Sequence, residues 1–229
     1  MPGVHSLGGT KGGRVRAFLV ESAGELTLVD TLFHGDAREV LAALRALGRS
    51  PRDVKRIVLT HAHRSHLGGV AALKRETGAQ VLSHAWEADV IAGERKAQSA
   101  SLRPMRPFRT YPFQLGIFLD KPPHRPCPVD EAVADGDAVG PLQALHAPGH
   151  SPGHLAFHLA EHGLLITGDA IVTWPRFEAG WRAFTLNPVQ QGESLARFAA
   201  LEPRIVAVGH GDEVTEDAAA KVHAFAERT

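Results

Sequence analysis

Four predicted strands in this chain of 229 residues lead directly into a histidine or an aspartate. The apolar run RIVLT is followed by His61 and His63, and LQALHAPG is followed by His150. In the same way, GLLITG leads to Asp169 and RIVAVG leads to His210. Strand ends in layered α/β proteins bring distant parts of a chain to one rim, where pockets form. We therefore expect these side chains to share one site.

The order of the predicted elements indicates the α/β fold class. Residues 14–30 are predicted to form a β-hairpin, because two apolar runs flank a turn at residues 22–24. A helix follows, with Asp36 as its expected N-cap and Gly48 as its C-terminal stop. Further strand-then-helix units continue to residue 93.

We interpret residues 1–229 as one domain with two halves, 1–93 and 129–229, the second being mostly β and closed by two helices. Residues 94–128 separate the halves and contain seven of the 15 prolines. Such a proline density argues against a regular element. We expect a lid or pocket wall here, or a long connection that its aromatic side chains pin to the core.

Composition narrows the range of partners. Lys and Arg (25) balance Asp and Glu (25), so no net charge attracts the chain to nucleic acid or to an anionic membrane. No apolar run approaches the roughly 18 residues that span a bilayer. The single cysteine, Cys127, excludes an internal disulfide and a four-thiolate zinc site. We expect a cytoplasmic protein with a small-molecule substrate and no nucleic-acid or membrane partner, and the composition allows a homodimer.

The spacing of the first histidines suits metal binding. His61 and His63 are two residues apart on extended backbone, so both side chains project to one side and can chelate one ion. His66 enters a helical turn and would serve a second ion, with the Asp169 carboxylate as the bridge between the two. Imidazole ligands favour zinc, and iron and manganese are also compatible. GGTKGG at residues 8–13 lacks the residues of a phosphate loop, and we expect a flexible lead-in.

Four short motifs together resemble those of the metallo-β-lactamase superfamily. They are HAHRSH at 61–66, APGHSPGH at 147–154, TGDA at 167–170 and GHG at 209–211. The segment LVDT, which ends at Thr31, is also similar. The resemblance implies a four-layer αββα sandwich with a metal site at the edge of its two sheets. It also implies that one metal is held by His61, His63 and His150, a second by His66 and His210, and that Asp169 bridges them.

One residue departs from the family pattern. The first motif of the family usually reads His-x-His-x-Asp-His, and Ser65 stands at the aspartate position. A serine hydroxyl is a poor metal ligand and does not titrate near neutral pH, so we expect a weakened second site. We assign catalytic roles to Asp169 and, at the acid/base position of the family, to Ser65. Asp212 and Glu213 are the nearest acids that could compensate.

The leading functional hypothesis is a metal-dependent hydrolase that uses metal-bound water on a small ester, thioester, lactone or phosphodiester. One or two zinc ions are the expected cofactor. One alternative is an oxidoreductase similar to the mononuclear non-haem iron sulfur dioxygenases of the family, with iron on His61, His150 and Asp169. Another is a degenerate member that binds metal with little turnover.

Two further groups of residues lie close to the motifs. Four aromatic residues within 173–187 form an amphipathic stripe if the segment is helical, and we expect a core element, a substrate wall or a subunit interface: Trp174, Phe177, Trp181 and Phe184. His154 and His158 fall in a predicted strand, where they would support the ligands or face the surface.

Overall fold

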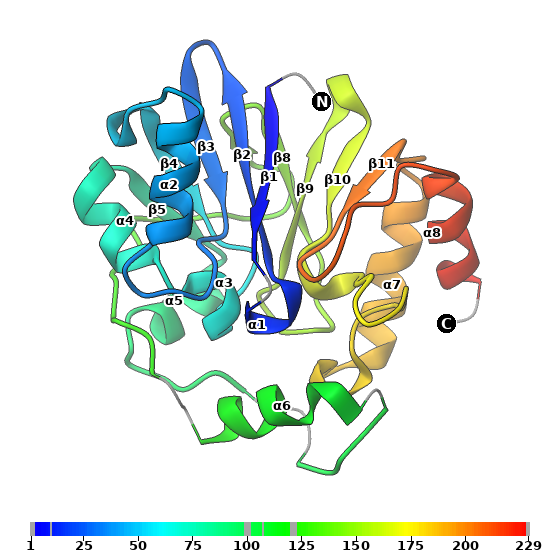
Figure 1. The fold of residues 1–229 in the computed structure, drawn as a ribbon. Helices are drawn as coiled ribbons and strands as arrows, with labels where there is room; N and C mark the ends of the chain where they lie inside the picture. The colour runs from blue at the N-terminus through cyan, green and yellow to red at the C-terminus, as the bar shows by residue number, and fades with distance from the viewer. Residues whose placement is uncertain (1–2, 10, 99–101, 107, 120–122, 228–229) are drawn as a thin grey trace.

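Two β-sheets occupy the middle of the molecule, and helices cover their outer faces (Figure 1). The computed structural model describes residues 3–9, 11–98, 102–106, 108–119 and 123–227. The strands of the first sheet are, in spatial order, β1 (Val4–Gly8), β2 (Arg16–Ser22), β3 (Glu25–Val29), β4 (Val54–Val58), β5 (Gln80–Ser83) and β6 (Glu131–Ala132). Those of the second sheet, again in spatial order, are β11 (Ile205–Ala207), β10 (Leu164–Ile166), β9 (Leu155–Leu159), β8 (Leu142–His146) and β7 (Ala138–Val139).

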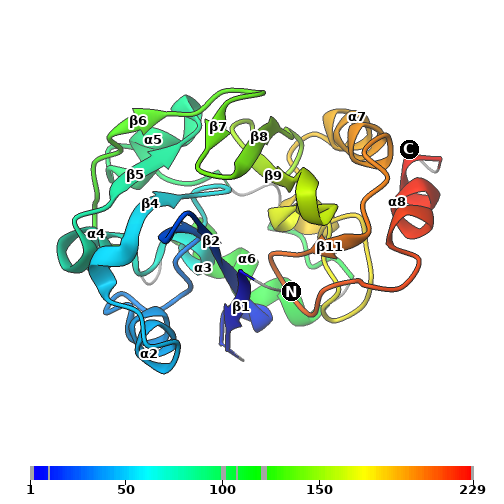
Figure 2. The same ribbon diagram turned by 90° about the horizontal axis from the view of Figure 1, so that it is seen from above.

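The described helices belong mostly to the two outer layers. They are α1 (Lys11–Arg14), α2 (Arg38–Ala46), α3 (Arg64–Leu67), α4 (Val70–Thr77), α5 (Ala85–Ile91), α6 (Tyr111–Phe118), α7 (Pro188–Ala199) and α8 (Ala218–Ala226). Seen from above, α2, α4 and α5 lie outside the first sheet, and α7 and α8 lie outside the second (Figure 2). Short 3₁₀ turns occur at Pro51–Asp53, Phe108–Thr110, Ala160–His162, Gly168–Ala170 and Arg182–Phe184.

Apolar side chains on both faces of the strands form three buried layers, one between the two sheets and one between each sheet and its helices. Ile57 packs under the helices of the first half, whereas its neighbour Val58 packs between the two sheets. Likewise Ile166 lies between the sheets and Leu165 packs under α7 and α8. Successive residues of a strand point to opposite faces, so both faces of each sheet are buried. The predicted α/β class and four-layer αββα sandwich are confirmed.

The pairing of the strands explains why the ligand-bearing loops meet. β8 and β10 both run antiparallel to β9, and β11 runs parallel to β10. The carboxyl ends of β8, β10 and β11 therefore lie at one rim of the second sheet. In Figure 1, the loop after β4 reaches the same lower rim from the first sheet.

The hairpin and the first long helix form close to where the sequence predicts them. β2 pairs antiparallel with β3, and Ala23 and Gly24 turn the chain with positive φ angles of 51° and 82°. The predicted N-cap Asp36 is wrong by one residue, since Ala37 caps α2. Ala37 has φ 54°, so the turn into the helix comes after Asp36, whose carboxylate accepts a hydrogen bond from the Arg38 N–H.

Two expectations of irregular structure are wrong within the described residues. The proline-rich segment contains α6, because Pro112 lies in its first turn, where a proline removes no intrahelical hydrogen bond. The expected flexible lead-in is partly ordered, since β1 ends at Gly8 and α1 begins at Lys11; Thr10 lies outside the described residues. None of the described helices has the length and apolarity that crossing a membrane requires.

Candidate metal centre

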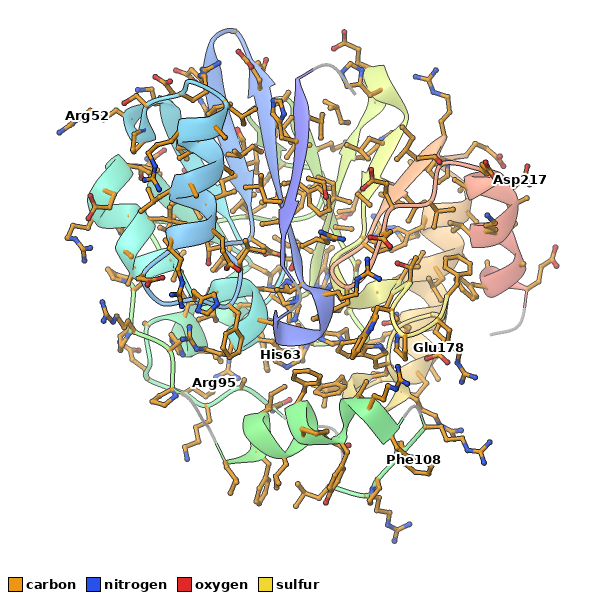
Figure 3. All side chains as sticks on the ribbon, in the orientation of Figure 1. Arg52, His63, Arg95, Phe108, Glu178 and Asp217 are labelled. Atoms are coloured by element: carbon orange, nitrogen blue, oxygen red, sulfur yellow. The ribbon has the colours of Figure 1, made fainter. Side chains whose placement is uncertain are left out.

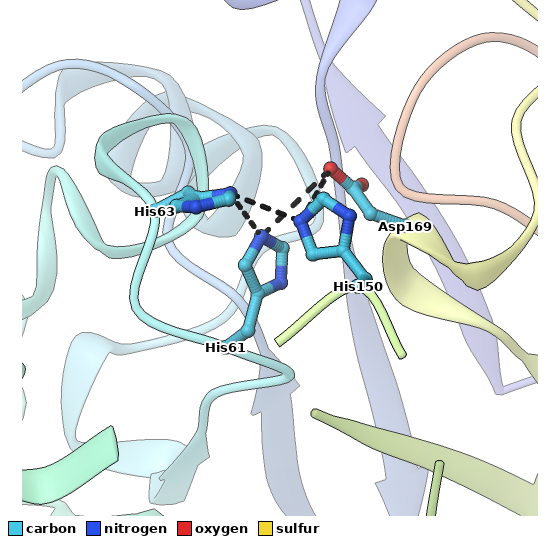
Figure 4. Close-up of side chains that lie close together, drawn as sticks. All are labelled: His61, His63, His150 and Asp169. Atoms are coloured by element: carbon cyan, nitrogen blue, oxygen red, sulfur yellow. Dashed lines mark hydrogen bonds and ion pairs between the residues drawn. The ribbon is translucent and has the colours of Figure 1, made fainter. Parts of the chain in front are cut away.

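All six side chains that the sequence proposes as metal ligands come together at this rim. They form two clusters that share one aspartate, namely His61, His63, His150 and Asp169, and His66, Asp169 and His210. Within each cluster the candidate ligand atoms lie within 4.8 Å of one another, and every member is buried. Figure 4 shows the first cluster, whose ring nitrogens and carboxylate face a common centre.

The first cluster is built around His63. Its Nδ1 lies 3.1 Å from Nε2 of His61 and 3.0 Å from Nε2 of His150. Asp169 Oδ2 lies 3.6 Å from Nε2 of His150 and 3.8 Å from Nε2 of His61. Three ring nitrogens and one carboxylate oxygen from both halves of the chain therefore converge.

The second cluster uses both oxygens of the same carboxylate. Nε2 of His66 lies 3.2 Å from Nε2 of His210. Asp169 Oδ1 lies 3.3 Å from Nε2 of His66, and Oδ2 lies 3.3 Å from Nε2 of His210. This places Asp169 between the clusters, where a bridging carboxylate is needed.

Hydrogen bonds from the outer ring nitrogens orient the histidines. The Thr60 hydroxyl donates to Asp30 Oδ2 at 2.8 Å, so it accepts from Nδ1 of His61 at 3.0 Å. Nδ1 of His66 donates to the same Asp30 oxygen at 2.8 Å. Because Nδ1 of each ring makes this outer hydrogen bond, Nε2 faces the clusters, which is the orientation that a metal ligand needs.

The N-terminal glycines support the second cluster. Nδ1 of His210 donates to the Gly13 carbonyl at 2.9 Å, which leaves its Nε2 free to face His66. Gly13 has φ 76°, and a Cβ there would lie 3.0 Å from the Trp181 ring. The glycine-rich segment thus has a structural reason for its glycines that the sequence prediction missed.

The histidines of the two clusters differ in the direction of their pKa shifts. Burial lowers the pKa of His61 and His150 well below the usual range, and it lowers that of His63 to about 4. At His66 burial also disfavours the charge, but Asp169 and Asp30 outweigh it and raise the pKa to about 10. The first cluster therefore offers neutral imidazoles, and the second lies where two carboxylates favour positive charge.

His154 and Gly209 fix the position of Asp169. Its backbone N–H donates to Nε2 of His154 at 3.1 Å, and His154 is fully buried. A Cβ at Gly209 would lie 2.2 Å from Asp169 Oδ1, so only glycine leaves room for the carboxylate there. Of the two expectations for His154, the structure favours support of the ligands over a surface position.

The donor atoms suit a metal ion. Asp169 Oδ1 is buried and makes no hydrogen bond within the described part of the chain, although buried carboxylate oxygens normally have a partner. A cation between the facing nitrogens and this oxygen would satisfy it. Neutral imidazole and carboxylate together suit zinc, iron and manganese.

A family model for the metallo-beta-lactamase superfamily matches residues 10–210. This chain is a member of the metallo-β-lactamase superfamily. Protein YobT of Bacillus subtilis (strain 168) is 31% identical over 216 residues, which cover 86% of this chain and 83% of that protein. The hydroxyacylglutathione hydrolase of Rhodobacter capsulatus is 30% identical over 189 residues, which cover 80% of this chain but only 59% of the hydrolase. Family membership and these hydrolases support a metal-dependent hydrolase.

Solved structures of superfamily members share the fold. TTHA1429 of Thermus thermophilus, a metallo-beta-lactamase family protein, superposes with a TM-score of 0.70 at 28% identity, over 100% of this chain and 79% of that one. TTHA1623 in a di-iron-bound form gives a TM-score of 0.69 at 28% identity, over 92% of this chain and 94% of that one.

A cavity of about 860 Å³ opens beside the candidate metal centre. His63 and Ser65 form part of its wall, which connects the cavity to the first cluster. Apolar side chains dominate the rest of the lining, and α6 contributes Phe113 and Ile117. The volume is that of a small-molecule site.

Helix α6 and the aromatic residues near 180 form the outer wall of the cavity together. Phe113 stacks on Trp181 at 6.3 Å between centroids with an interplanar angle of 11°. Trp181 in turn lies 4.3 Å from the His210 ring, and Trp174 lines the cavity. In Figure 3, α6 lies directly below His63, with side chains filling the space between. Helix α6 of this segment thus lines the cavity and packs on the aromatic residues of the second half, and the lid or pocket-wall role of segment 94–128 stays a prediction.

The four aromatic residues do not form the helical stripe that would place them on one face. Only Arg182–Phe184 is a short 3₁₀ turn within that segment. Trp174, Trp181 and Phe184 pack with the wall, whereas Phe177 turns away and contacts Phe225 of α8 at 4.6 Å between ring centroids.

Ser65 lies in α3, is partly buried and lines the cavity. The residue therefore borders the space where a substrate would lie, and its catalytic role stays a prediction. Asp212, one of the acids that the sequence analysis names as able to compensate for Ser65, is exposed and pairs with Arg14 and Arg16 at 2.8 and 2.7 Å.

The sequence analysis missed two buried acids that support the site. Asp30 follows β3 in LVDT, and its place at a strand end was the available signal. Glu87 lies in α5 and is 2% exposed, with its carboxylate accepting the Ala62 N–H at 3.1 Å. No local pattern distinguishes it from a surface glutamate of a helix.

Proposed function

We propose that this chain hydrolyses a small ester or thioester at a metal centre held by the two clusters. The observation that carries the proposal is Asp169, which contributes one carboxylate to both clusters beside a cavity of about 860 Å³. The relatives named as hydroxyacylglutathione hydrolases favour a thioester within this class. Lactones and phosphodiesters are the next substrates to test.

Each cluster residue has a defined part in this proposal. His61, His63 and His150 would hold one ion, and His66 and His210 a second, with Asp169 between them. The bound metal would lower the pKa of a water molecule and polarise the acyl carbonyl. Asp30 and Thr60 keep the rings of His61 and His66 in the ligating orientation, and Asp169 is the carboxylate nearest to both clusters.

The overall reaction consumes one water molecule. The bond between the acyl carbon and the alcohol oxygen or thiol sulfur breaks, and the water oxygen joins the acyl carbon. One water proton ends on the departing alcohol or thiol, and the acid loses the other to solvent. We assign Asp169 to proton handling beside the clusters and Ser65 to a hydrogen bond with the substrate.

The proposed partner is a small molecule, with no nucleic acid or membrane involved. The cavity supports this, because its lining is mostly apolar and its size matches a small ligand. A homodimer is proposed through the outer face of α6, where Phe118 is 53% exposed and Leu119 beside it is 47% exposed.

We propose zinc as the metal, with iron as the second candidate because TTHA1623 is di-iron-bound. Iron-dependent oxidation would use His61, His150 and Asp169 as two histidines and a carboxylate. The position of His63, 3.0 Å from His150, favours a fourth protein ligand at this ion and therefore hydrolysis.

The test combines metal analysis with a substrate panel. Protein purified without added metal is analysed for zinc, iron and manganese, and its colour is recorded. It is then assayed on thioesters, esters, lactones and phosphodiesters, with His150→Ala as the inactive control. Turnover that depends on zinc supports the proposal, whereas a coloured iron protein with oxygen uptake and no hydrolysis overturns it.

A further inference from the structure

Arg64 lies between two residues of the site, His63 and Ser65, and lines the same cavity. Its guanidinium carbon lies 5.1 Å from the centre of the Phe33 ring, which also lines the cavity. The side chain is only partly buried. It thus places a positive charge in the wall of the cavity that His63 and Ser65 also line.

Nothing in the described part of the chain neutralises this charge. Nε and Nη1 of Arg64 are buried without a hydrogen-bond acceptor, and no carboxylate of the described residues lies within 4.0 Å of the guanidinium. Donors of this kind are costly to leave unpaired. Burial, together with the charge of Arg125, lowers the pKa of Arg64 below its usual value.

Arg64 differs from the other charged groups of the cavity in being partly buried with unpaired donors. Arg95 is engaged, since its guanidinium stacks 3.9 Å above the Trp86 ring and donates to the Trp86 carbonyl. Glu94 and Lys96 are both exposed at the cavity wall. Arg64, partly buried and with two unpaired donors, therefore lines a cavity whose wall is mostly apolar.

We propose that Arg64 binds an anionic oxygen group of the substrate, a carboxylate or a phosphate, at a point remote from the scissile bond. This assignment rests on the proposed hydrolase function and narrows it. The substrate is an ester or thioester with an apolar body, which packs against side chains such as Phe33, Phe113 and Trp174, and with one anionic group. Arg64 acts as a specificity residue and takes no part in bond cleavage.

The kinetic test compares two esters that differ only in charge. Para-nitrophenyl hydrogen adipate ends in a carboxylate, and para-nitrophenyl methyl adipate carries the same chain with that carboxylate methylated. Loss of a charge-assisted hydrogen bond predicts that Arg64→Gln lowers kcat/KM for the anionic ester by about 10- to 100-fold, mainly through KM. Hydrolysis of the neutral ester stays within about twofold, and Arg64→Lys retains part of the preference.

The ratio of the two esters is independent of the fraction of folded enzyme, so a destabilised variant still gives an answer. Arg52→Gln is the matched control, because Arg52 is exposed at the end of the molecule opposite His63 (Figure 3). An equal loss for both esters in Arg64→Gln, or no loss for either, overturns the proposal.

A binding measurement separates this proposal from the hydrolase function. Calorimetry on the metal-loaded protein uses hydrocinnamate, phenyl phosphate and the uncharged hydrocinnamamide as ligands. We expect Arg64→Gln to weaken at least one anion by about 10-fold and to leave the amide unchanged, and the anion affected identifies the group. If wild type hydrolyses neither ester but shows this pattern, the hydrolase proposal fails and the anion site stands; unchanged anion binding removes the anion site.

Discussion

Glu87 Oε1 accepts a hydrogen bond from the Ser151 hydroxyl at 2.5 Å. The same oxygen accepts the Gly153 N–H, and Oε2 accepts the Ala62 N–H at 3.1 Å. Ala62 separates His61 from His63, and Ser151 follows His150. One buried carboxylate therefore fixes the two loops that carry the first cluster relative to each other.

Replacing Glu87 with alanine should loosen this cluster. Three buried donors lose their acceptor, so we expect a loss of about 2–5 kcal/mol in stability and a reduced metal content. Thermal unfolding and metal analysis measure both quantities. Glu76→Ala is the control, since Glu76 is exposed and its ion pair is with the adjacent Arg75 at the surface. A variant with native metal content would show that the loops do not depend on Glu87.

Removing His150 should abolish metal binding in the first cluster, because water replaces an imidazole ligand poorly. His158→Ala is the matched control: it lies in β9, a few residues further along the chain, and belongs to neither cluster. We expect the control to keep its metal and its activity. Full metal stoichiometry in His150→Ala, measured by elemental analysis, would show that the ligand assignment is wrong.

Asp30→Asn should weaken the second metal more than the first. Asp30 accepts directly from His66, whereas it reaches His61 only through Thr60. Loss of such a partner typically costs about 10- to 100-fold in metal affinity. A metal titration should show the weaker step shifting to higher concentration while the tighter step moves less. Equal shifts in both steps would contradict the division into two clusters.

Phe113→Ala should raise KM without changing metal content. The substitution removes the ring that stacks on Trp181 and opens the outer wall of the cavity. We expect KM to rise by about 3- to 10-fold, as the loss of apolar contact with a ligand implies. Phe118→Ala, on the exposed side of the same helix, should leave KM unchanged. Unfolding of Phe113→Ala would instead identify the segment as part of the core.

Ser65→Asp restores the aspartate of the family pattern at a residue that lines the cavity. A carboxylate supplies an anionic ligand and a proton-handling group, so we expect tighter binding of the second metal and a higher kcat. Metal titration and kinetics on the best substrate test both effects. Unchanged occupancy with lower activity would favour a one-metal mechanism and the iron-dependent alternative.

The convergence of the six candidate ligands can be predicted from the sequence, because the sequence shows where each apolar strand ends. Apolar runs stop just before His61, His150, Asp169 and His210, and the pairing of the strands places these stops at one rim. The order of elements likewise predicts the α/β class, since helical and strand periodicities differ, whereas the four αββα layers are implied by the resemblance to the superfamily.

Other parts of the site depend on tertiary contacts that leave no local pattern. Helix α6 forms despite its prolines because Pro112 falls in the first turn. Gly13 lies beside His210, although the two residues are 197 positions apart in the chain. An isolated bridge between Val15 and His210 holds the two segments together there. The contact between Glu87 and Ser151 spans 64 residues, and neither residue signals the other in sequence.

The two clusters draw His61, His63 and His66 from one half of the chain and the remaining ligands from the other. A bound ion would therefore link the two sheets at the rim where they meet. Because the unfolded chain cannot present this set, each ion bound would stabilise the folded state by mass action. The melting temperature would then rise with free metal concentration. Removal of the metal by a chelator would weaken the contact between the two sheets before either sheet unfolded.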